Sequence, residues 1–219
     1  MSAQVNFDIV ARPYRWMEHM TFGPWLQRCR LTQLAHLSGA DRVLLLGDGD
    51  GRFLAQLLAA YPALKVDVVD SSAAMLRLLS RRVRYDGSET NICLHHANAL
   101  EWTPSGSYDL IVSHFFLDCF FSRDLDRLFD RVLPHARSGA RWVISEFAIP
   151  RKIIAGHAAR GIIALLYRTF GLLTGLPVRV LPDYAASLQR RGLVLTRERR
   201  YLAGLLCSQI WSLPTTGGK

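Results

Sequence analysis

The stretch from Arg42 to Asp70 reads RVLLLGDGDGRFLAQLLAAYPALKVDVVD, and it decides the fold. Residues 43–46 form a short apolar run of the kind that is buried on both faces of a parallel sheet. Three glycines follow at alternate positions, apolar residues then recur at helical spacing, and a valine-rich second strand ends at Asp70. This order predicts a β-α-β unit with a glycine loop after its first strand.

The glycine loop predicts a nucleoside site. Glycines let the backbone approach a ligand closely and leave amide donors exposed at the start of a helix. Asp70 ends the next strand about 20 residues later, where a carboxylate can accept hydrogen bonds from both ribose hydroxyls. The alternative is an ordinary tight turn without a ligand. A dinucleotide is disfavoured, because Arg52 stands where its third glycine, counted from Gly49, is expected.

Two motifs resemble those of the class I S-adenosylmethionine-dependent methyltransferases: the loop glycines, and the segment DSSAAML that begins at Asp70. The resemblance implies S-adenosylmethionine as cofactor. It also implies a Rossmann-like α/β fold, with a doubly wound, mostly parallel seven-stranded sheet, N-terminal helices and a helical lid after the fifth strand. The residues that it assigns to the cofactor are Tyr14, Gly47, Asp48, Gly49, Gly51, Asp70, Ser71, Met75, Asn98, Ala99, Leu100 and Ser113.

The chain departs from the superfamily's pattern at two positions. Leu45 stands where many members carry an acid that faces the methionine moiety, and we expect Asp48 to take that role. Asn98 replaces the acid at the end of the third strand, where an amide can still donate to and accept from an adenine edge. Asp50 is interpreted as a solvated loop acid.

Length and composition favour one domain of 219 residues with a sizeable core. The formal net charge of +9 raises the question of nucleic acid, but the arginines are scattered along the chain and form no long basic tail, so nucleic acid is an unlikely partner. The cysteines form no C-x-x-C pair, so neither zinc nor another metal is expected. The N-terminal sequence lacks the pattern of a secretory signal, which favours a cytoplasmic protein.

Two segments flank or interrupt the predicted sheet. Residues 1–38 are expected to form a helical cap, in which Tyr14, Arg15, Glu18 and His19 face the cofactor or, alternatively, lie on a surface helix. Residues 151–178 are predicted to insert a lid, whose long apolar stretch alternatively suits a peripheral membrane contact. A membrane span is disfavoured, because charges near its centre would each cost about 3 kcal/mol.

The reactive edge is predicted at the end of the fourth strand. Ligands of open α/β sheets lie beyond the carboxyl ends of the strands, where Ser113, His114 and Phe115 follow one another. His114 is the first candidate for a general base, and the other catalytic candidates are Asp118 and Glu146, with His19 and Tyr184 behind them. For any single one of these residues the alternative is a packing role. The motifs typical of methyl transfer to base amino groups or to cytosine carbon are missing.

The sequence therefore predicts methyl transfer to a small, aromatic or lipophilic acceptor, because phenylalanines crowd the predicted reactive edge. The pattern does not decide between O-, N- and C-methylation. Two alternatives remain open: an RNA methyltransferase, which the charge favours, and a non-catalytic cofactor-binding or peripheral membrane protein. The sequence does not indicate an oligomeric state.

Overall fold

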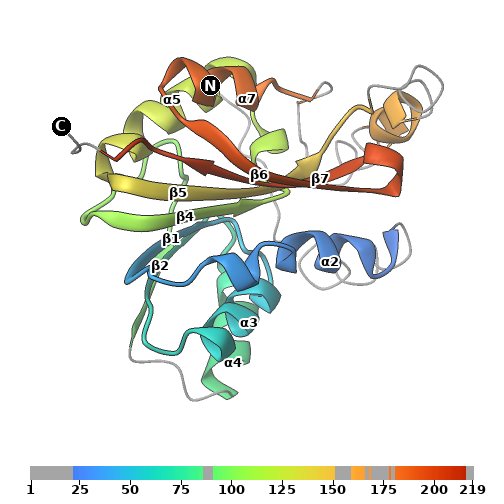
Figure 1. Cartoon of the computed structure of the whole chain (residues 1–219). Coiled ribbons are helices and arrows are strands. Elements are labelled where there is room, and N and C mark those ends of the chain that lie inside the picture. Colours follow the sequence, from blue (N-terminus) through green and yellow to red (C-terminus); the bar gives the residue numbers. More distant parts are fainter. Residues whose placement is uncertain are drawn as a thin grey trace.

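The computed structural model describes residues 22–85, 91–150, 159–165, 168, 178 and 181–215. Its seven strands form one sheet in the order β3-β2-β1-β4-β5-β7-β6 (Figure 1). The strands are β1 (Arg42–Leu46), β2 (Lys65–Asp70), β3 (Ile92–His96), β4 (Tyr108–His114), β5 (Ala136–Phe147), β6 (Val194–Tyr201) and β7 (Leu206–Ser212). The predicted seven-stranded α/β sheet is confirmed.

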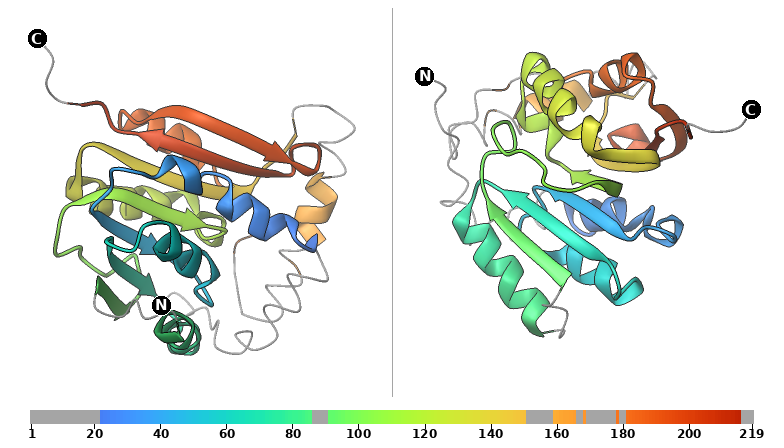
Figure 2. Two further views of the ribbon diagram at one scale, coloured as in Figure 1. Left: turned by 60° about the horizontal axis from the view of Figure 1, so that its bottom comes forward. Right: turned by 90° about the vertical axis from the view of Figure 1, so that its left-hand side faces the viewer.

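The sheet is mixed rather than simply parallel. β1 to β5 pair in parallel, whereas β7 pairs antiparallel with β5 and β6 antiparallel with β7. The last two strands form a hairpin at one edge of the sheet, so β7 runs against both of its neighbours (Figures 1 and 2). β5 begins at Ala136, and it includes Gly139 with a positive φ of 74° beside a register shift against β4.

Helices cover both faces of the sheet (Figures 1 and 2). One face carries α2 (Trp25–Leu31), α3 (Arg52–Ala60) and α4 (Ala73–Tyr85), and the other carries α5 (Ser122–Val132) and α7 (Tyr184–Arg190). Leu45, Leu54 and Leu79 belong to the core on the first face, and Leu44, Leu128 and Trp142 belong to the core on the second. Alternate residues of β1 therefore enter opposite cores, which explains its uninterrupted apolar sequence.

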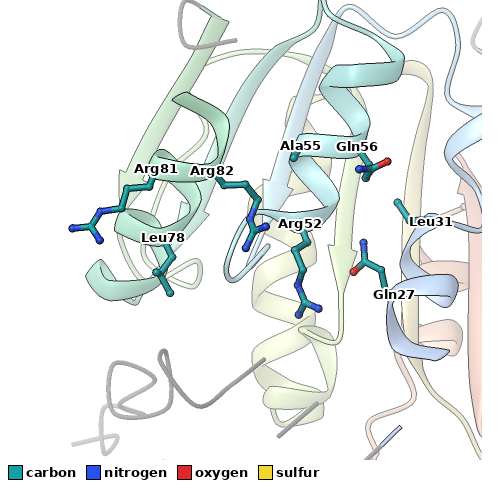
Figure 3. Close-up of a pocket in the computed structure, with 8 residues that line it drawn as sticks. All are labelled: Gln27, Leu31, Arg52, Ala55, Gln56, Leu78, Arg81 and Arg82. Carbon is teal, nitrogen blue, oxygen red and sulfur yellow. The ribbon is translucent and has the colours of Figure 1, made fainter. Parts of the chain in front are cut away.

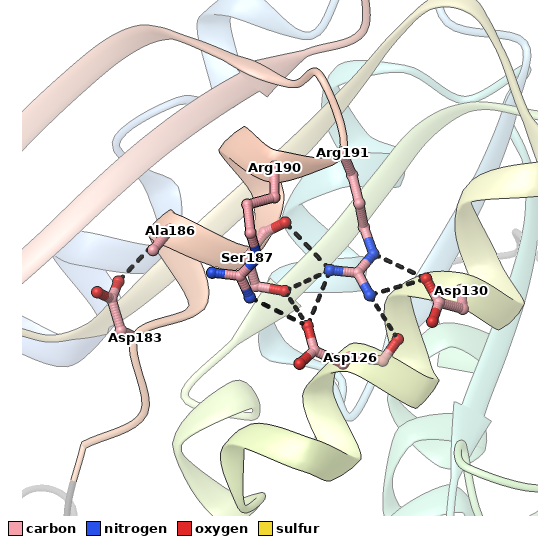
Figure 4. Close-up of polar contacts among 7 residues, drawn as sticks. All are labelled: Asp126, Asp130, Asp183, Ala186, Ser187, Arg190 and Arg191. Atoms are coloured by element: carbon pink, nitrogen blue, oxygen red, sulfur yellow. Dashed lines mark hydrogen bonds and ion pairs between the residues drawn. The ribbon is translucent and has the colours of Figure 1, made fainter.

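Helix α7 is fixed to α5 by a network of charged groups (Figure 4). The guanidinium of Arg191 donates to Asp130 Oδ1 and to Asp126 Oδ1, both at 2.8 Å. The Ser187 hydroxyl also donates to Asp126, and the Asp183 carboxylate caps α7 by accepting from the amide of Ala186 at 3.0 Å. These polar contacts close the second layer over the sheet.

The predicted cap and lid lie largely outside the described residues. Of the cap, the structure describes residues 22–38, which include α2, and of the lid it describes residues 159–165, 168 and 178. Residues 159–165 are helical, and Ala159 and Ile163 are buried in a cluster with Leu205 and Val178. Among the described residues, no helix is both long enough and apolar enough to cross a membrane.

Candidate active site

The predicted site residues meet at one edge of the sheet because β1 to β5 run in the same direction. The registers of adjacent strands place Leu46 beside Val69 and Ser113, Asp70 beside His96, and His114 beside Ser145. The residues that follow these strand ends therefore surround one region. Open α/β sheets bind their ligands in this position.

The glycine loop after β1 needs glycine at each of its three positions. Gly47, Gly49 and Gly51 have φ values of 65°, 64° and 80°, a region that other residues rarely adopt. The Gly47 amide donates to the carbonyl of Val69 at 3.0 Å, which joins the loop to the end of β2. A Cβ on Gly51 would lie 2.9 Å from the Cα of Leu79 in α4. A Cβ on Gly49 would meet no atom within 4 Å, so this glycine borders open space.

Asp48 lies inside this loop with a half-buried side chain. Its carboxylate accepts a hydrogen bond from the amide of Leu54, in the first turn of α3, at 3.2 Å. Burial raises the pKa of Asp48 to about 7, and the Leu54 hydrogen bond opposes this shift. A carboxyl group near the glycines is thus poised between its two protonation states. This position is compatible with the predicted role of Asp48 beside the cofactor, which stays a prediction.

Asp50 holds the glycine loop through ion pairs with two arginines, so its interpretation as a solvated loop acid is wrong. Its side chain is buried and pairs with Arg52 Nε at 2.9 Å and with Arg82 Nη2 at 3.0 Å. Arg82 Nε also donates to the Asp50 carbonyl at 2.8 Å. Arg82 comes from α4, so the glycine loop is held by a helix distant in sequence. A single sequence does not reveal this pairing, because the two residues lie 32 positions apart.

The segment after β2 forms a turn into α4. Asp70 Oδ1 accepts a hydrogen bond from the amide of Ser72 at 2.8 Å, and the Ser72 hydroxyl accepts from the amide of Met75 at 3.1 Å. Ser71 is exposed and its carbonyl contacts His96 Nε2 at 3.1 Å, whereas Met75 is buried. The turn fixes the Asp70 carboxylate at the ligand edge, where we predict it to bind the ribose.

The segment after β3 forms a second tight turn at this edge. Asn98 is exposed, and its Oδ1 accepts from the amide of Leu100 at 3.0 Å. Ala99 is buried in the core, and Leu100 is partly buried against it. The Asn98 side chain therefore shapes its own turn, while its predicted contact with adenine stays untested.

Two neighbours at the end of β4 point to opposite faces of the sheet. Ser113 is completely buried, and its hydroxyl accepts a hydrogen bond from Trp142 Nε1 at 3.0 Å. His114 packs edge-on against Phe53 of α3, with ring centroids 4.5 Å apart, and neither ring nitrogen has a partner among the described residues. Burial, together with the charge of Arg30, lowers the pKa of His114 well below its usual value. The imidazole is therefore neutral at pH 7, and its burial beside Arg30 disfavours the protonated ring.

The chain after His114 carries backbone strain. Phe115 has a φ of 51°, uncommon for an aromatic residue, and its amide donates to the carbonyl of Ser145 at 2.7 Å. Its ring packs against Phe147 at a centroid distance of 5.3 Å, and the guanidinium of Arg30 lies 5.1 Å from the ring centroid. Arg30 is buried on α2 and was missed by sequence reasoning, because an arginine in an amphipathic helix usually lies on the solvent side.

Glu146 holds the loop that follows β4. Its Oε1 accepts from the amides of Phe116 and Leu117 at 2.9 and 2.7 Å, while Oε2 is buried without a partner among the described residues. Burial and the nearby Asp118 raise the pKa of Glu146 well above its usual value, and burial raises the pKa of Asp118 to about 6. The two carboxyl groups thus form a buried pair that favours protonation.

Three further candidates remain to be placed. Tyr14, together with His19, falls outside the described residues. Tyr184 is buried on α7, where its hydroxyl donates to Gln209 Oε1 at 3.1 Å. Among the described residues, no group of three or more histidine, cysteine or acidic side chains is arranged to bind a metal ion.

The donor set fits a nucleoside without phosphates. Asp70 offers a carboxylate for hydroxyl groups, Asn98 offers an amide, and the open space at Gly49 admits a ligand close to the backbone. The sheet order, the glycine loop and the acid at the end of β2 are those expected of an α/β domain of the methyltransferase type. Residues 43–139 also match the family model of a methyltransferase domain. This match supports the resemblance to the class I S-adenosylmethionine-dependent methyltransferases, and with it S-adenosylmethionine as the cofactor.

Solved structures share this fold at low sequence identity. An O-methyltransferase family protein from Burkholderia thailandensis superposes with a TM-score of 0.73 at 16% identity over 94% of this chain. The mitomycin 7-O-methyltransferase MmcR gives a TM-score of 0.70 at 16% identity over 95% of this chain. This chain spans only 60% of the length of either protein.

A third structure is closer to this chain in length. The N-methyltransferase NodS from Bradyrhizobium japonicum WM9, in complex with S-adenosylhomocysteine, gives a TM-score of 0.61 at 14% identity. The match covers 92% of this chain and 88% of NodS. No curated protein sequence matches this chain.

Proposed function

We propose that the protein transfers the methyl group of S-adenosylmethionine to a small aromatic or lipophilic acceptor. The observation that carries this proposal is the set of aromatic side chains at and after the carboxyl ends of β4 and β5: Phe115, Phe116, Phe120 and Phe147, of which Phe116 packs on Gly47 of the glycine loop. Aromatic side chains around a ligand edge favour an acceptor with an apolar body. The name of MmcR, a mitomycin 7-O-methyltransferase, is in keeping with an organic acceptor of this kind.

In this proposal the protein mainly aligns the two reactants. When bound, the cofactor supplies a sulfonium methyl group that an acceptor atom attacks in line, so the protein has to hold both in register and exclude water. Asp70 would bind the ribose hydroxyls, and the glycine loop would lie along the nucleoside. Glu146 would fix the aromatic wall, because it holds the amides of Phe116 and Leu117.

A protonated acceptor, such as a phenol, needs a base. His114 is the first candidate for this role, because its ring is neutral and its nitrogens have no partner among the described residues, while its lowered pKa makes it a weak base. Asp118 is the second candidate, since its pKa of about 6 leaves it mostly ionised at pH 7. A neutral amine acceptor already has a free lone pair on nitrogen, so it would place less demand on either residue.

The RNA methyltransferase alternative is weakened by where the arginines lie. Arg42, Arg137 and Arg191 pair with buried or half-buried acids at 2.8 to 2.9 Å, in separate parts of the molecule. Arg200 pairs with Glu198 on its own strand at 2.8 Å. Much of the positive charge therefore serves internal ion pairs, and these arginines form no continuous groove for a phosphate backbone.

The test is transfer of a labelled methyl group from S-adenosylmethionine to a panel of phenols, aromatic amines and transfer RNA. We expect product only with small aromatic acceptors. His114→Asn should lower kcat for a phenol about 100-fold or more, within the range of general base catalysis, while leaving the Kd of S-adenosylhomocysteine unchanged. Methylation of transfer RNA instead would support the alternative and contradict this proposal.

A further inference from the structure

The turn between β6 and β7 is apolar and lies at the ligand edge of the sheet. Because β7 runs antiparallel to β5, this turn stands beside the carboxyl end of β5, where the amide of Ala148 donates to the carbonyl of Leu205 at 2.8 Å. Turns between strands usually carry glycine, proline, asparagine, aspartate or serine. Residues 202–205 read LAGL instead. Apart from its glycine, the turn therefore has only apolar side chains.

Two residues of this turn have backbone angles that are uncommon for their types. Leu202 and Ala203 have φ values of 49° and 54°, in the left-handed region that glycine or asparagine adopts more easily. Ala203 is exposed, and Leu202 packs partly buried in a cluster with Phe22. The chain thus keeps apolar side chains where another residue would fold with less strain, which indicates that these side chains have a function of their own.

A further exposed apolar side chain belongs to the same end of the molecule. Ile149, just after β5, is 40% exposed. Its neighbour Pro150 is the residue that a Cβ on Gly204 would approach, at 3.5 Å, so the end of β5 and the turn lie side by side. We call Ile149, Leu202 and Ala203 the apolar tip.

Two aromatic rings and two arginines form a stack next to the apolar tip. The ring centroids of Tyr201 and Trp25 are 5.9 Å apart, and the Tyr201 hydroxyl contacts Thr32 Oγ1 at 2.9 Å. The guanidinium of Arg199 lies 5.6 Å from the ring centroid of Tyr201, and that of Arg28 lies 5.0 Å from the ring centroid of Trp25. Figure 2 shows α2 running beside the hairpin. We call these two rings and two arginines the basic collar.

The side chains follow the same order on both elements. Along β6, the order away from the turn is apolar residues, then the ring, then the guanidinium. Phe22, just before α2, packs with the turn, whereas Gln33, just after α2, donates to the carbonyl of Ser208 further along β7. Helix α2 therefore leads away from the turn, and Trp25 lies nearer the apolar tip than Arg28.

The positive charge of the collar is not neutralised by a described acid. Arg28 and Arg199 are exposed and form no ion pair with a described residue, whereas Arg200 pairs with Glu198 at 2.8 Å. Glu198 also accepts from Gln209 Nε2 at 2.7 Å, and Gln209 faces α7 rather than α2. Helix α2 and strand β7 contain no acidic residue. A guanidinium that stacks on a ring keeps N–H donors at its edge, so the collar attracts an anionic partner.

A bilayer with anionic headgroups matches this order of side chains. Apolar groups reach the acyl chains, tryptophan and tyrosine favour the membrane interface, and arginines extend toward the headgroups. A single-stranded nucleic acid fits less well, because its bases need open ring faces for stacking. Each ring of the collar already has a guanidinium over it.

We propose that the apolar tip and the basic collar dock the protein on the surface of an anionic phospholipid bilayer. The tip enters the boundary between headgroups and acyl chains, the two rings lie at that boundary, and the two arginines bind lipid phosphates. Docking brings the ligand edge of the sheet to the bilayer. It is independent of the proposed methyl transfer, because neither cofactor nor acceptor takes part in it.

Cosedimentation with lipid vesicles tests the proposal, without cofactor or acceptor. We expect saturable binding to vesicles of phosphatidylcholine and phosphatidylglycerol in equal parts, about tenfold or more tighter than to phosphatidylcholine alone, and weaker at high salt. Equal binding to both kinds of vesicle, or no binding to the anionic ones, would overturn the proposal. Tighter binding of a single-stranded RNA oligonucleotide than of anionic vesicles would also overturn it, since the collar would then be a nucleic-acid site.

A matched pair of charge reversals locates the surface. Arg199→Glu should weaken binding to anionic vesicles about tenfold or more. Arg81→Glu makes the same change at an exposed arginine of α4, which packs on β2 and β3 at the opposite side of the sheet from β6. Figure 3 shows Arg81 pointing away from α2, and its reversal should change vesicle binding less than twofold. Equal weakening by both variants would show attraction to the general charge of the molecule and would contradict a docking surface.

A third variant tests the apolar tip without adding a charge. Asparagine tolerates a positive φ, so Ala203→Asn should fold as stably as the wild type in a thermal melt. It places a polar group at the tip and should weaken vesicle binding severalfold. Unchanged vesicle binding by a folded Ala203→Asn protein would remove the tip from the docking surface.

Discussion

The ring of Phe116 occupies the space that a side chain at Gly47 would need. A Cβ built on Gly47 would lie 2.3 Å from Cδ2 of Phe116, far inside the contact distance of two carbon atoms. Because Phe116 follows β4 and Gly47 follows β1, this contact packs the predicted acceptor wall directly on the cofactor loop. The glycine is therefore required by packing as well as by its φ of 65°.

Gly47→Ala should push the Phe116 loop and the glycine loop apart. Strain at a positive φ costs about 1 kcal/mol, and the overpacked ring adds roughly 1 to 3 kcal/mol. We expect a lower melting temperature and S-adenosylhomocysteine binding at least tenfold weaker by calorimetry. Gly39→Ala is the control, since Gly39 has a φ of 80° and a Cβ there would meet no atom within 4 Å. If both variants bind equally well, the contact with Phe116 does not shape the cofactor site.

Asp70→Asn tests the predicted ribose contact while retaining an oxygen that can cap Ser72. Loss of hydrogen bonds to a charged group should weaken S-adenosylhomocysteine binding by roughly 1.5 to 3 kcal/mol. The melting temperature without ligand should change little, because the turn at Ser72 persists. Asp130→Asn, at a mostly exposed acid on α5, should leave affinity unchanged. An unaltered Kd for Asp70→Asn would remove Asp70 from the site.

The buried carboxyl pair gives the protein a pH-dependent stability. Folding raises the pKa of Glu146 well above its usual value and that of Asp118 to about 6, so the folded state binds more protons than the unfolded state above about pH 4. The contribution of this pair is therefore present at low pH and is lost as the pH rises through the folded pKa values.

Glu146→Gln measures that effect. The amide oxygen can still accept from Phe116 and Leu117, but the side chain no longer ionises. We expect the free energy of unfolding, measured by urea titration between about pH 5 and 8, to fall less steeply with pH in the variant than in the wild type. Glu101→Gln, at an exposed position away from the pair, should reproduce the wild-type slope. Parallel slopes for all three proteins would contradict a buried pair with raised pKa values.

The helical residues 159–165 test the predicted lid. Leu165 is 67% exposed, whereas Ile163 is only 6% exposed and packs against Leu205. Leu165→Ser should reduce acceptor turnover without weakening cofactor binding, because a lid completes the acceptor site only on closure. Ile163→Ala should instead destabilise the protein by roughly 2 to 4 kcal/mol in chemical denaturation. If Leu165→Ser unfolds the protein, this helix is part of the core and the lid prediction is wrong. If the variant only loses binding to lipid vesicles, the helix is a membrane anchor instead of a lid. Leu166 and Phe170 lie outside the described residues.

Sequence periodicity predicts most of the fold because the buried strands are continuous apolar runs. Residues 43–46 are all apolar and residues 66–69 contain three valines around Asp67, and both segments are buried strands. The start of β5 at Ala136 could not be predicted, since the polar residues at its beginning are allowed only by their exposed position on the sheet. The glycine spacing predicted the cofactor loop correctly, because each glycine has a positive φ that depends only on the local backbone.

Contacts between residues that are distant in the chain could not be predicted from the sequence. The clamp of Arg82 on Asp50 and the burial of Arg30 beside Phe115 arise from helix packing, which single residues do not encode. Glu146 was identified as a site residue from its place at a strand end, but its hydrogen bonds to the loop of Phe116 depend on the strand order in the folded sheet. Charge and spacing therefore indicate which residues lie at the ligand edge of the sheet, whereas the packing of helices and strands determines which partners they contact.

The most direct test of the central claim is a calorimetric comparison of S-adenosylhomocysteine and NAD as ligands of the wild-type protein. The glycine loop, with Arg52 in place of a third glycine, suits a nucleoside without a pyrophosphate. We predict saturable binding of S-adenosylhomocysteine at one site per chain and no measurable binding of NAD at the same concentrations. Equal or tighter binding of NAD would contradict the assignment of the cofactor and, with it, the proposed methyl transfer.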